Sequence, residues 1–359
     1  MNPWLAARNV LVVRLDNIGD VVMLGPALRA VKDASRETSI TLLASPGGAV
    51  AAPLLPSIDD VITYRPVWQD VHNRIPFDSA REMDFVRLLA ARRFDAALIF
   101  TSFSQSPHIP GYVCYLAGIP LRAGESKEFG GGTLTTELKG APDALHQTER
   151  NLRLVEELGF AVRDRRLEVF ISKDAAESVP ALLRRAGLNP GEPYVLLHPG
   201  ASAEARRYPP ERFGSVAQGL IDRGHQVLVT GVEREQQILD VVMARAPEAG
   251  LLVGATTMME YAALVDRAAL VLCGNTLPLH LADALRTPSV VLYSGTDYEE
   301  QWRPRYAPSH LLRRLTPCHP CYLFQCPIGQ PCLDISPPEV IRASEAMLAR
   351  AREPVGGPR

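Results

Sequence analysis

The sequence predicts an α/β protein made of two doubly wound domains, each built on a parallel sheet. Short apolar runs alternate with helix-spaced apolar segments through both halves of the chain, as expected for strands separated by crossover helices. The 359 residues, 47% of them hydrophobic, exceed one average core and suit two domains. One strand-turn-helix unit with polar turn residues occurs in each half, which predicts a ligand cleft between the domains.

Four apolar runs predict the strands of the first half: Val10–Val13, Ile40–Leu43, Val61–Tyr64 and Ala96–Phe100. Four others predict strands of the second half: Tyr194–Leu197, Gln226–Thr230, Leu270–Cys273 and Ser289–Tyr293. Helical spacing is clearest over Pro26–Lys32, Asp84–Arg92, His146–Gly159, Pro210–Arg223, Glu233–Ala246, Met258–Asp266 and Pro337–Arg352. We therefore expect an N-terminal domain over residues 1–175 and a C-terminal domain over 176–336. Residues 337–359 would form a C-terminal helix and tail, with a return of the helix to the first domain as an open alternative.

Composition narrows the class of protein. The formal net charge is −2 and 22% of residues are charged, so no global positive field favours nucleic acid as a partner. We find no run of about 18 apolar residues and no apolar N-terminal stretch, so neither a membrane span nor a signal peptide is expected. The sequence indicates a cytoplasmic enzyme, with peripheral contact to the inner face of the cytoplasmic membrane as an open alternative.

The turn after the first strand contains Asp16, Asn17, Gly19 and Asp20. A carboxylate at the start of a helix can simply cap that helix, and this structural role fits Asp16 best. Asp20 follows a glycine and could instead enter the cleft and act as a base on a sugar hydroxyl. Both roles remain open for Asp20 on residue type alone.

Three turns of the second half carry groups suited to a nucleotide. Small residues around Ser202 precede Arg206 and Arg207, which could neutralise a pyrophosphate or merely lie on a solvated loop. Thr230 and Gly231 end a strand before Glu235, which could accept hydrogen bonds from a ribose or favour a helix N-terminus. In the third turn, Asn275 and Thr276 are N-cap types and Pro278 suits a first helical turn. His280 would then lie near a bound diphosphate, or serve as a structural hydrogen bonder.

Several common motifs do not occur. There is no Asp-x-Asp to hold a metal–diphosphate, so a departing diphosphate would be stabilised by arginines, amides and helix dipoles. There is also no Gly-x-Gly-x-x-Gly after the first strand and no Gly-x-x-x-x-Gly-Lys-Ser/Thr. These absences disfavour Rossmann dehydrogenases and P-loop NTPases.

Five segments together resemble glycosyltransferase family 9, the ADP-heptose:lipopolysaccharide heptosyltransferase family. They are RLDNIGDVVMLGPAL (14–28), HPGASAEARRYPPERF (198–213), VTGVEREQ (229–236), NTLPLHLADAL (275–285) and PCHPCYLFQCP (317–327). The resemblance implies a GT-B fold, with two Rossmann-like domains across a cleft, and an inverting transferase that needs no metal for transfer.

The resemblance also assigns roles to residues. Asp20 matches the family's proposed general base, Arg206 a lysine that contacts the donor phosphate, and Glu235 the acid that contacts the nucleoside. Asn275, Thr276, Leu277, Pro278 and His280 match the donor-phosphate turn. Leu277 occupies a position where the family usually has glycine, and its side chain would restrict how closely the backbone approaches a diphosphate. This departure and the arginine at 206 affect the expected donor more than the fold.

The sequence also holds a cysteine group near its end. Cys318, Cys321, Cys326 and Cys332 form C-x2-C-x4-C-x5-C in a proline-rich loop. Four thiolates at this spacing could hold structural zinc or iron, or remain reduced and without a ligand. Cys114 and Cys273 are expected in the core.

The working hypothesis is a metal-independent, inverting transfer of heptose from ADP-heptose to a lipopolysaccharide-core or other cell-surface glycan. A sugar-nucleotide epimerase or hydrolase of the same shape is one alternative. A non-catalytic nucleotide-sugar-binding protein is another, because of Leu277.

Overall fold

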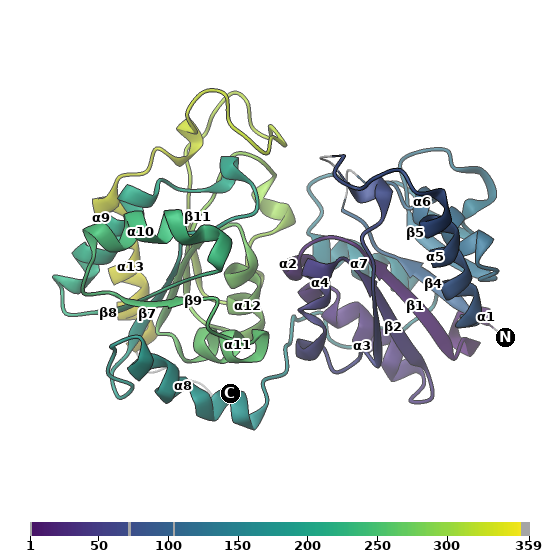
Figure 1. Cartoon of the computed structure of the whole chain (residues 1–359), viewed down its shortest axis with the longest axis horizontal. Coiled ribbons are helices and arrows are strands. Elements are labelled where there is room, and N and C mark those ends of the chain that lie inside the picture. The colour runs from purple at the N-terminus through teal and green to yellow at the C-terminus, as the bar shows by residue number, and fades with distance from the viewer. Residues whose placement is uncertain (1, 71–72, 103–104, 353–359) are drawn as a thin grey trace. The chain divides into compact units, whose positions relative to one another are not determined.

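The computed structural model describes residues 2–70, 73–102 and 105–352, and these residues form two compact units. The first unit ends at Val169 and the second begins at Phe170, a few residues before the domain boundary expected from the sequence. Each unit contains a six-stranded parallel sheet with helices on both faces (Figure 1). The predicted fold class, two doubly wound α/β domains, is confirmed.

The sheet of the first unit has the strand order β3-β2-β1-β4-β5-β6. Its strands are β1 (Asn9–Arg14), β2 (Ser39–Ala44), β3 (Asp60–Thr63), β4 (Ala96–Ile99), β5 (Leu121–Glu125) and β6 (Thr136–Leu138). Its helices are α1 (Pro3–Ala6), α2 (Ile18–Val22), α3 (Gly25–Ala34), α4 (Pro46–Ala49), α5 (Ser79–Ala91), α6 (His108–Leu116) and α7 (Gln147–Glu157). The strand order reverses between β1 and β4, so a crevice for ligands is expected beyond the carboxyl ends of these two strands.

The sheet of the second unit has the order β12-β11-β10-β7-β8-β9. Its strands are β7 (Tyr194–His198), β8 (Gln226–Gly231), β9 (Gly250–Val253), β10 (Leu270–Gly274), β11 (Ser289–Leu292) and β12 (Ser309–Leu312). Its helices are α8 (Lys173–Arg185), α9 (Pro210–Ile221), α10 (Gln236–Arg245), α11 (Met258–Arg267), α12 (Leu277–Leu285) and α13 (Pro337–Arg352). Here the order reverses between β7 and β10.

The cores explain why the central strands are so apolar. Along β1, Leu11 and Val13 pack with Phe85 and Leu89 of α5 on one face of the first sheet. Buried side chains of α9, α10 and α13 cover one face of the second sheet. Strands buried on both faces need nearly continuous apolar runs, and this is the pattern that the sequence shows.

Helix α13 belongs to the second unit. It packs against α9 and against β10, β11 and β12 of that unit. The tail, residues 353–359, lies outside the described residues. Within those residues, none of the helices has both the length and the hydrophobicity to cross a bilayer.

Candidate functional site

The turn after β1 is organised around Asp20, the residue expected to act as a base. The chain leaves β1 at Arg14 and enters α2 at Ile18, with Asn17 as the N-cap residue. The Asn17 backbone N–H donates to Asp20 Oδ2 at 3.1 Å. This bond ties the carboxylate back to the start of its own short helix and limits its rotamers.

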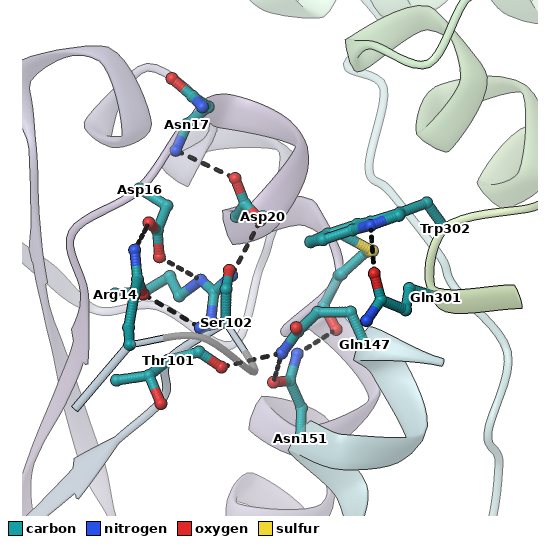
Figure 2. A network of polar contacts seen from close by, with 12 residues as sticks. Arg14, Asp16, Asn17, Asp20, Thr101, Ser102, Gln147, Asn151, Gln301 and Trp302 are labelled. Atoms are coloured by element: carbon teal, nitrogen blue, oxygen red, sulfur yellow. Dashed lines mark hydrogen bonds and ion pairs between the residues drawn. The ribbon is translucent and has the colours of Figure 1, made fainter. Parts of the chain in front are cut away.

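Arg14 holds the other oxygen of Asp20. The Arg14 side chain is fully buried, and its Nη2 donates to Asp20 Oδ1 at 2.8 Å and to Ser102 Oγ at 3.0 Å (Figure 2). Ser102 follows β4, the strand beside β1. The cation therefore joins the two strand ends at the point where the strand order reverses.

Asp16 is a second carboxylate on the same cation. Its Oδ2 lies 3.1 Å from Arg14 Nε, and its Oδ1 accepts a hydrogen bond from Gln105 Nε2 at 2.5 Å. Burial raises the pKa of the Asp16 carboxyl; the Arg14 charge opposes this shift and the Asp20 charge adds to it.

This corner can hold a carboxylate in one orientation and still expose it. The Asp20 side chain keeps 12% of its surface accessible although both of its oxygens accept hydrogen bonds. Such a group can accept a proton from a hydroxyl placed against it. Of the other predicted turn residues, Gly19 is buried and Asn17 is exposed. The charged contacts of this turn are made by Asp16 and Asp20.

In the second unit, Arg206 pairs with a carboxylate that the sequence analysis missed. Its Nη2 lies 2.7 Å from Asp297 Oδ2, and its Nε donates to Thr296 Oγ1 at 3.2 Å. Asp297 is buried, whereas 27% of the Arg206 side chain is exposed. An aspartate fixes the position of the guanidinium, and the Arg206 side chain as a whole stays partly exposed.

The turn after β10 lies next to Arg206. The Arg206 carbonyl packs against Gly274, and Asn275 Nδ2 donates to the hydroxyl of Tyr293 at 3.1 Å. Thr276 is the N-cap residue of α12, and Leu277 begins the helix, followed by the buried Pro278. His280 is buried in the first turn, edge-on to Trp302 at 6.3 Å between ring centroids. We call Arg206, Asp297, Thr296 and the 275–280 turn the cationic corner.

Thr230 and Glu235 belong to a second group, at the ends of β7 and β8. Thr230 is buried, and its hydroxyl lies 3.3 Å from His198 Nδ1 and 3.5 Å from the hydroxyl of Tyr261. Burial lowers the pKa of His198, while the charge of Glu235 opposes this shift.

Glu235 is buried and already bonded. Its Oε2 accepts the Val232 backbone N–H at 3.0 Å, and a Cβ added at Gly200 would lie 2.2 Å from its Oε1. Gly231 ends β8 beside this group, and Ser202 is exposed on the loop after β7. The structure thus gathers Arg206 with the 275–280 turn, and Thr230 with His198 and Glu235.

The residues that sequence reasoning missed share one signal. Arg14, Ser102, His198 and Asp297 are polar groups at, or within a few residues of, the carboxyl end of an apolar strand. Arg14, the last residue of β1, and His198, the last residue of β7, stand in the quoted motifs but receive no role from the sequence. The partners of Arg14 depend on how the turn after β1 folds.

The four cysteines are not assembled as metal ligands. Cys318 is exposed, Cys321 and Cys326 are half-buried and Cys332 is buried. Among residues 2–70, 73–102 and 105–352, no three His, Cys, Asp or Glu side chains come together as a group that could hold a metal ion. Cys114 and Cys273 are buried, which confirms their place in the core.

Comparison with known proteins identifies the family. Residues 83–330 match the family model of glycosyltransferase family 9 (heptosyltransferase). Lipopolysaccharide heptosyltransferase 3 of Escherichia coli K12 is 30% identical over 164 residues, which is 44% of this chain and 46% of that protein. The chain thus spans less than half the length of the heptosyltransferase 3 relatives that it matches.

Two solved structures are similar over nearly the whole chain. The family 9 glycosyl transferase of Veillonella parvula gives a TM-score of 0.79 at 19% identity, covering 96% of this chain and 98% of that one. E. coli ADP-heptose lipopolysaccharide heptosyltransferase II gives 0.75 at 20% identity, covering 95% and 99%. These likenesses support the GT-B fold. Because the family model covers well over half of its residues, the chain belongs to glycosyltransferase family 9 (heptosyltransferase).

Proposed function

We propose that this chain transfers heptose from ADP-heptose to a hydroxyl of a lipopolysaccharide core or another cell-surface glycan, with inversion at the anomeric carbon. The observation that carries the proposal is the Asp20 carboxylate, fixed by Arg14 and the Asn17 N–H at the switch point of the first sheet. Family membership supplies the reaction class, and the name of a similar structure, an ADP-heptose heptosyltransferase, supplies the donor.

In this proposal Asp20 takes the proton of the acceptor hydroxyl. The acceptor oxygen forms a bond to the anomeric carbon, the bond from that carbon to the diphosphate breaks, and ADP leaves. A single displacement of this kind inverts the anomeric centre. Asp20 is suited to it because two hydrogen bonds fix its orientation before the acceptor arrives.

The cationic corner would bind the departing diphosphate without a metal. Arg206 supplies a guanidinium on a partly exposed side chain, and the backbone N–H groups at the start of α12, after Thr276, can bind an anion. His280 and Asn275 lie in the same turn. The group of Thr230, His198 and Glu235 would contact the nucleoside, with Ser202, Gly231, Leu277 and Pro278 bordering the donor.

A transfer assay tests the proposal. Purified protein is given ADP-heptose and a deacylated core oligosaccharide, with and without EDTA, and the anomeric configuration of the product is determined by NMR. Inverted product at the same rate in EDTA supports it. Free heptose or an epimerised donor at a comparable rate without acceptor would favour the hydrolase or epimerase, and tight binding without turnover would favour the binding protein.

Two further proposals accompany this function. We propose a cytoplasmic location, with contact at the inner membrane face where a glycolipid acceptor would be presented; vesicle flotation tests the contact. Structural zinc or iron on the four cysteines is the second proposal, although the described thiols do not form a ligand group in this structure. Elemental analysis of protein purified without chelators tests it.

A further inference from the structure

The cysteine-rich segment lies against the residues assigned to the donor phosphate. We call residues 313–333 the cysteine loop; it leaves β12 and reaches α13 through a short 3₁₀ turn at Pro331–Leu333. It exposes large apolar side chains, among them Leu315 at 80%, Phe324 at 62% and Ile328 at 63%. Because so much of its apolar surface faces solvent, the loop has little core of its own. Its position therefore depends mainly on its polar contacts with neighbouring turns.

Two of these contacts bind the turn that carries Arg206. The Ala205 backbone N–H donates to the Phe324 carbonyl at 3.0 Å. Gln330 Nε2 donates to the Glu204 carbonyl at 2.5 Å. Gln330 is itself held, because its N–H donates to Cys326 Sγ at 3.2 Å.

Other contacts bind the turn that carries Thr296 and Asp297. The backbone N–H groups of Cys321 and Tyr322 donate to the carbonyls of Gly295 at 3.2 Å and of Thr296 at 2.8 Å. Cys332 packs directly on Gly295, where an added Cβ would lie 3.3 Å from its own Cβ. The loop thus bonds to both turns whose side chains form the Arg206–Asp297–Thr296 group.

We propose that the cysteine loop is a positioning element of the cationic corner, which holds Arg206 and Thr296 in the geometry that binds a diphosphate. The inference rests on the proposed function, since it assumes that this corner receives the donor phosphates. Loop contacts and diphosphate binding are then linked, so loosening the loop weakens the ligand and the ligand restrains the loop. The loop acts through Arg206 and Thr296 and does not itself touch the reacting atoms.

The test compares Gln330→Ala and Cys326→Ala with Ile328→Ser, an exposed change in the same loop. ADP and adenosine affinities are measured by calorimetry. For Gln330→Ala, ADP affinity should fall about threefold to tenfold, the loss expected for one hydrogen bond, while adenosine affinity stays unchanged. Cys326→Ala should act in the same direction and Ile328→Ser should leave both affinities as in the wild type. Equal losses for ADP and adenosine, or no loss for either, would overturn the inference.

Hydrogen exchange in the ligand-free protein separates the two proposals. Gln330→Ala should speed amide exchange in peptides that contain residues 204–207 and 294–297, whereas Ile328→Ser should not. Failure of the wild type to bind ADP would count against the proposed donor, and the exchange result would still decide whether the loop positions the corner. Unchanged exchange in Gln330→Ala would refute the loop's role even if the wild type is an active transferase.

Discussion

Each unit has one arginine that binds carboxylates at its candidate site, and the two arginines differ in burial and in the number of carboxylates that they contact. Arg14 is fully buried and serves two carboxylates, whereas Arg206 is 27% exposed and serves one. With both carboxylates ionised, the group of Arg14, Asp16 and Asp20, which we call the first corner, would carry one net negative charge. The Arg206–Asp297 pair is neutral. The comparison teaches that the first corner is built to hold a carboxylate and the second to present a cation.

The largest loss of activity is expected at Asp20, the proposed base of the transfer reaction. Asp20→Asn should slow transfer about a thousandfold, within the range for a lost general base, because the amide cannot accept the proton. ADP affinity should stay within about twofold, since Asp20 lies in the other unit from the cationic corner. Steady-state rates and calorimetry measure the two quantities. Asp33→Asn, an exposed carboxylate of α3, is the matched control, and comparable turnover in Asp20→Asn would remove Asp20 from the base role.

Arg14→Gln tests whether a buried cation maintains the first corner. It leaves two partly buried carboxylates without their partner, and removal of one side of a buried pair costs about 3–5 kcal/mol of unfolding free energy. Transfer should also slow, because no cation then holds the Asp20 carboxylate in its orientation. Denaturant unfolding and steady-state rates are the measurements. Arg14→Lys should restore part of the transfer rate; unchanged transfer in Arg14→Gln would limit Arg14 to packing.

Arg206→Ala tests the exposed cation. ADP affinity should fall by about tenfold to a hundredfold, the loss for one or two hydrogen bonds to a charged group, with adenosine affinity retained. Arg206→Lys should recover only part, since an ammonium cannot bind Asp297 and Thr296 in the same fork. Arg223→Ala, which removes an exposed charge two residues after α9, is the control. Equal ADP binding by Arg206→Ala would place the diphosphate elsewhere.

The smallest effect is expected at Asp16, the other carboxylate on Arg14. Asp16→Asn should change transfer by under about threefold, or about 0.7 kcal/mol of barrier. Burial raises the folded-state pKa of Asp16, so the folded chain loses stability as pH rises from the unfolded to the folded pKa. The unfolding free energy of Asp16→Asn minus that of the wild type, measured in urea, should therefore be higher at pH 7 than at pH 3.5. A loss as large as that of Asp20→Asn would show that the two carboxylates act together.

The sequence predicted the central strands better than the outer ones. All eight strands expected from apolar runs are present, whereas β5, β6, β9 and β12 were missed. These four lie at or next to the sheet edges, and β5 carries Arg122 and Glu125. Strands near an edge can be short or polar, so their runs give a weaker signal. The helices α6 and α8 and the four-residue helices α1 and α4 were also missed, and the expected helix from Glu233 begins as a 3₁₀ turn over Glu233–Glu235 before α10.

By itself the sequence determined the two-unit α/β plan and the turns that carry polar groups, because apolar period and turn chemistry are local properties. Only the tertiary structure decided which groups meet. Parallel pairing brings residues that are far apart in the chain to one strand edge, as with Arg14 and Ser102, Arg206 and Asp297, or the cysteine loop and Glu204. Such contacts depend on strand order and burial, and neither can be deduced from a single segment of the sequence.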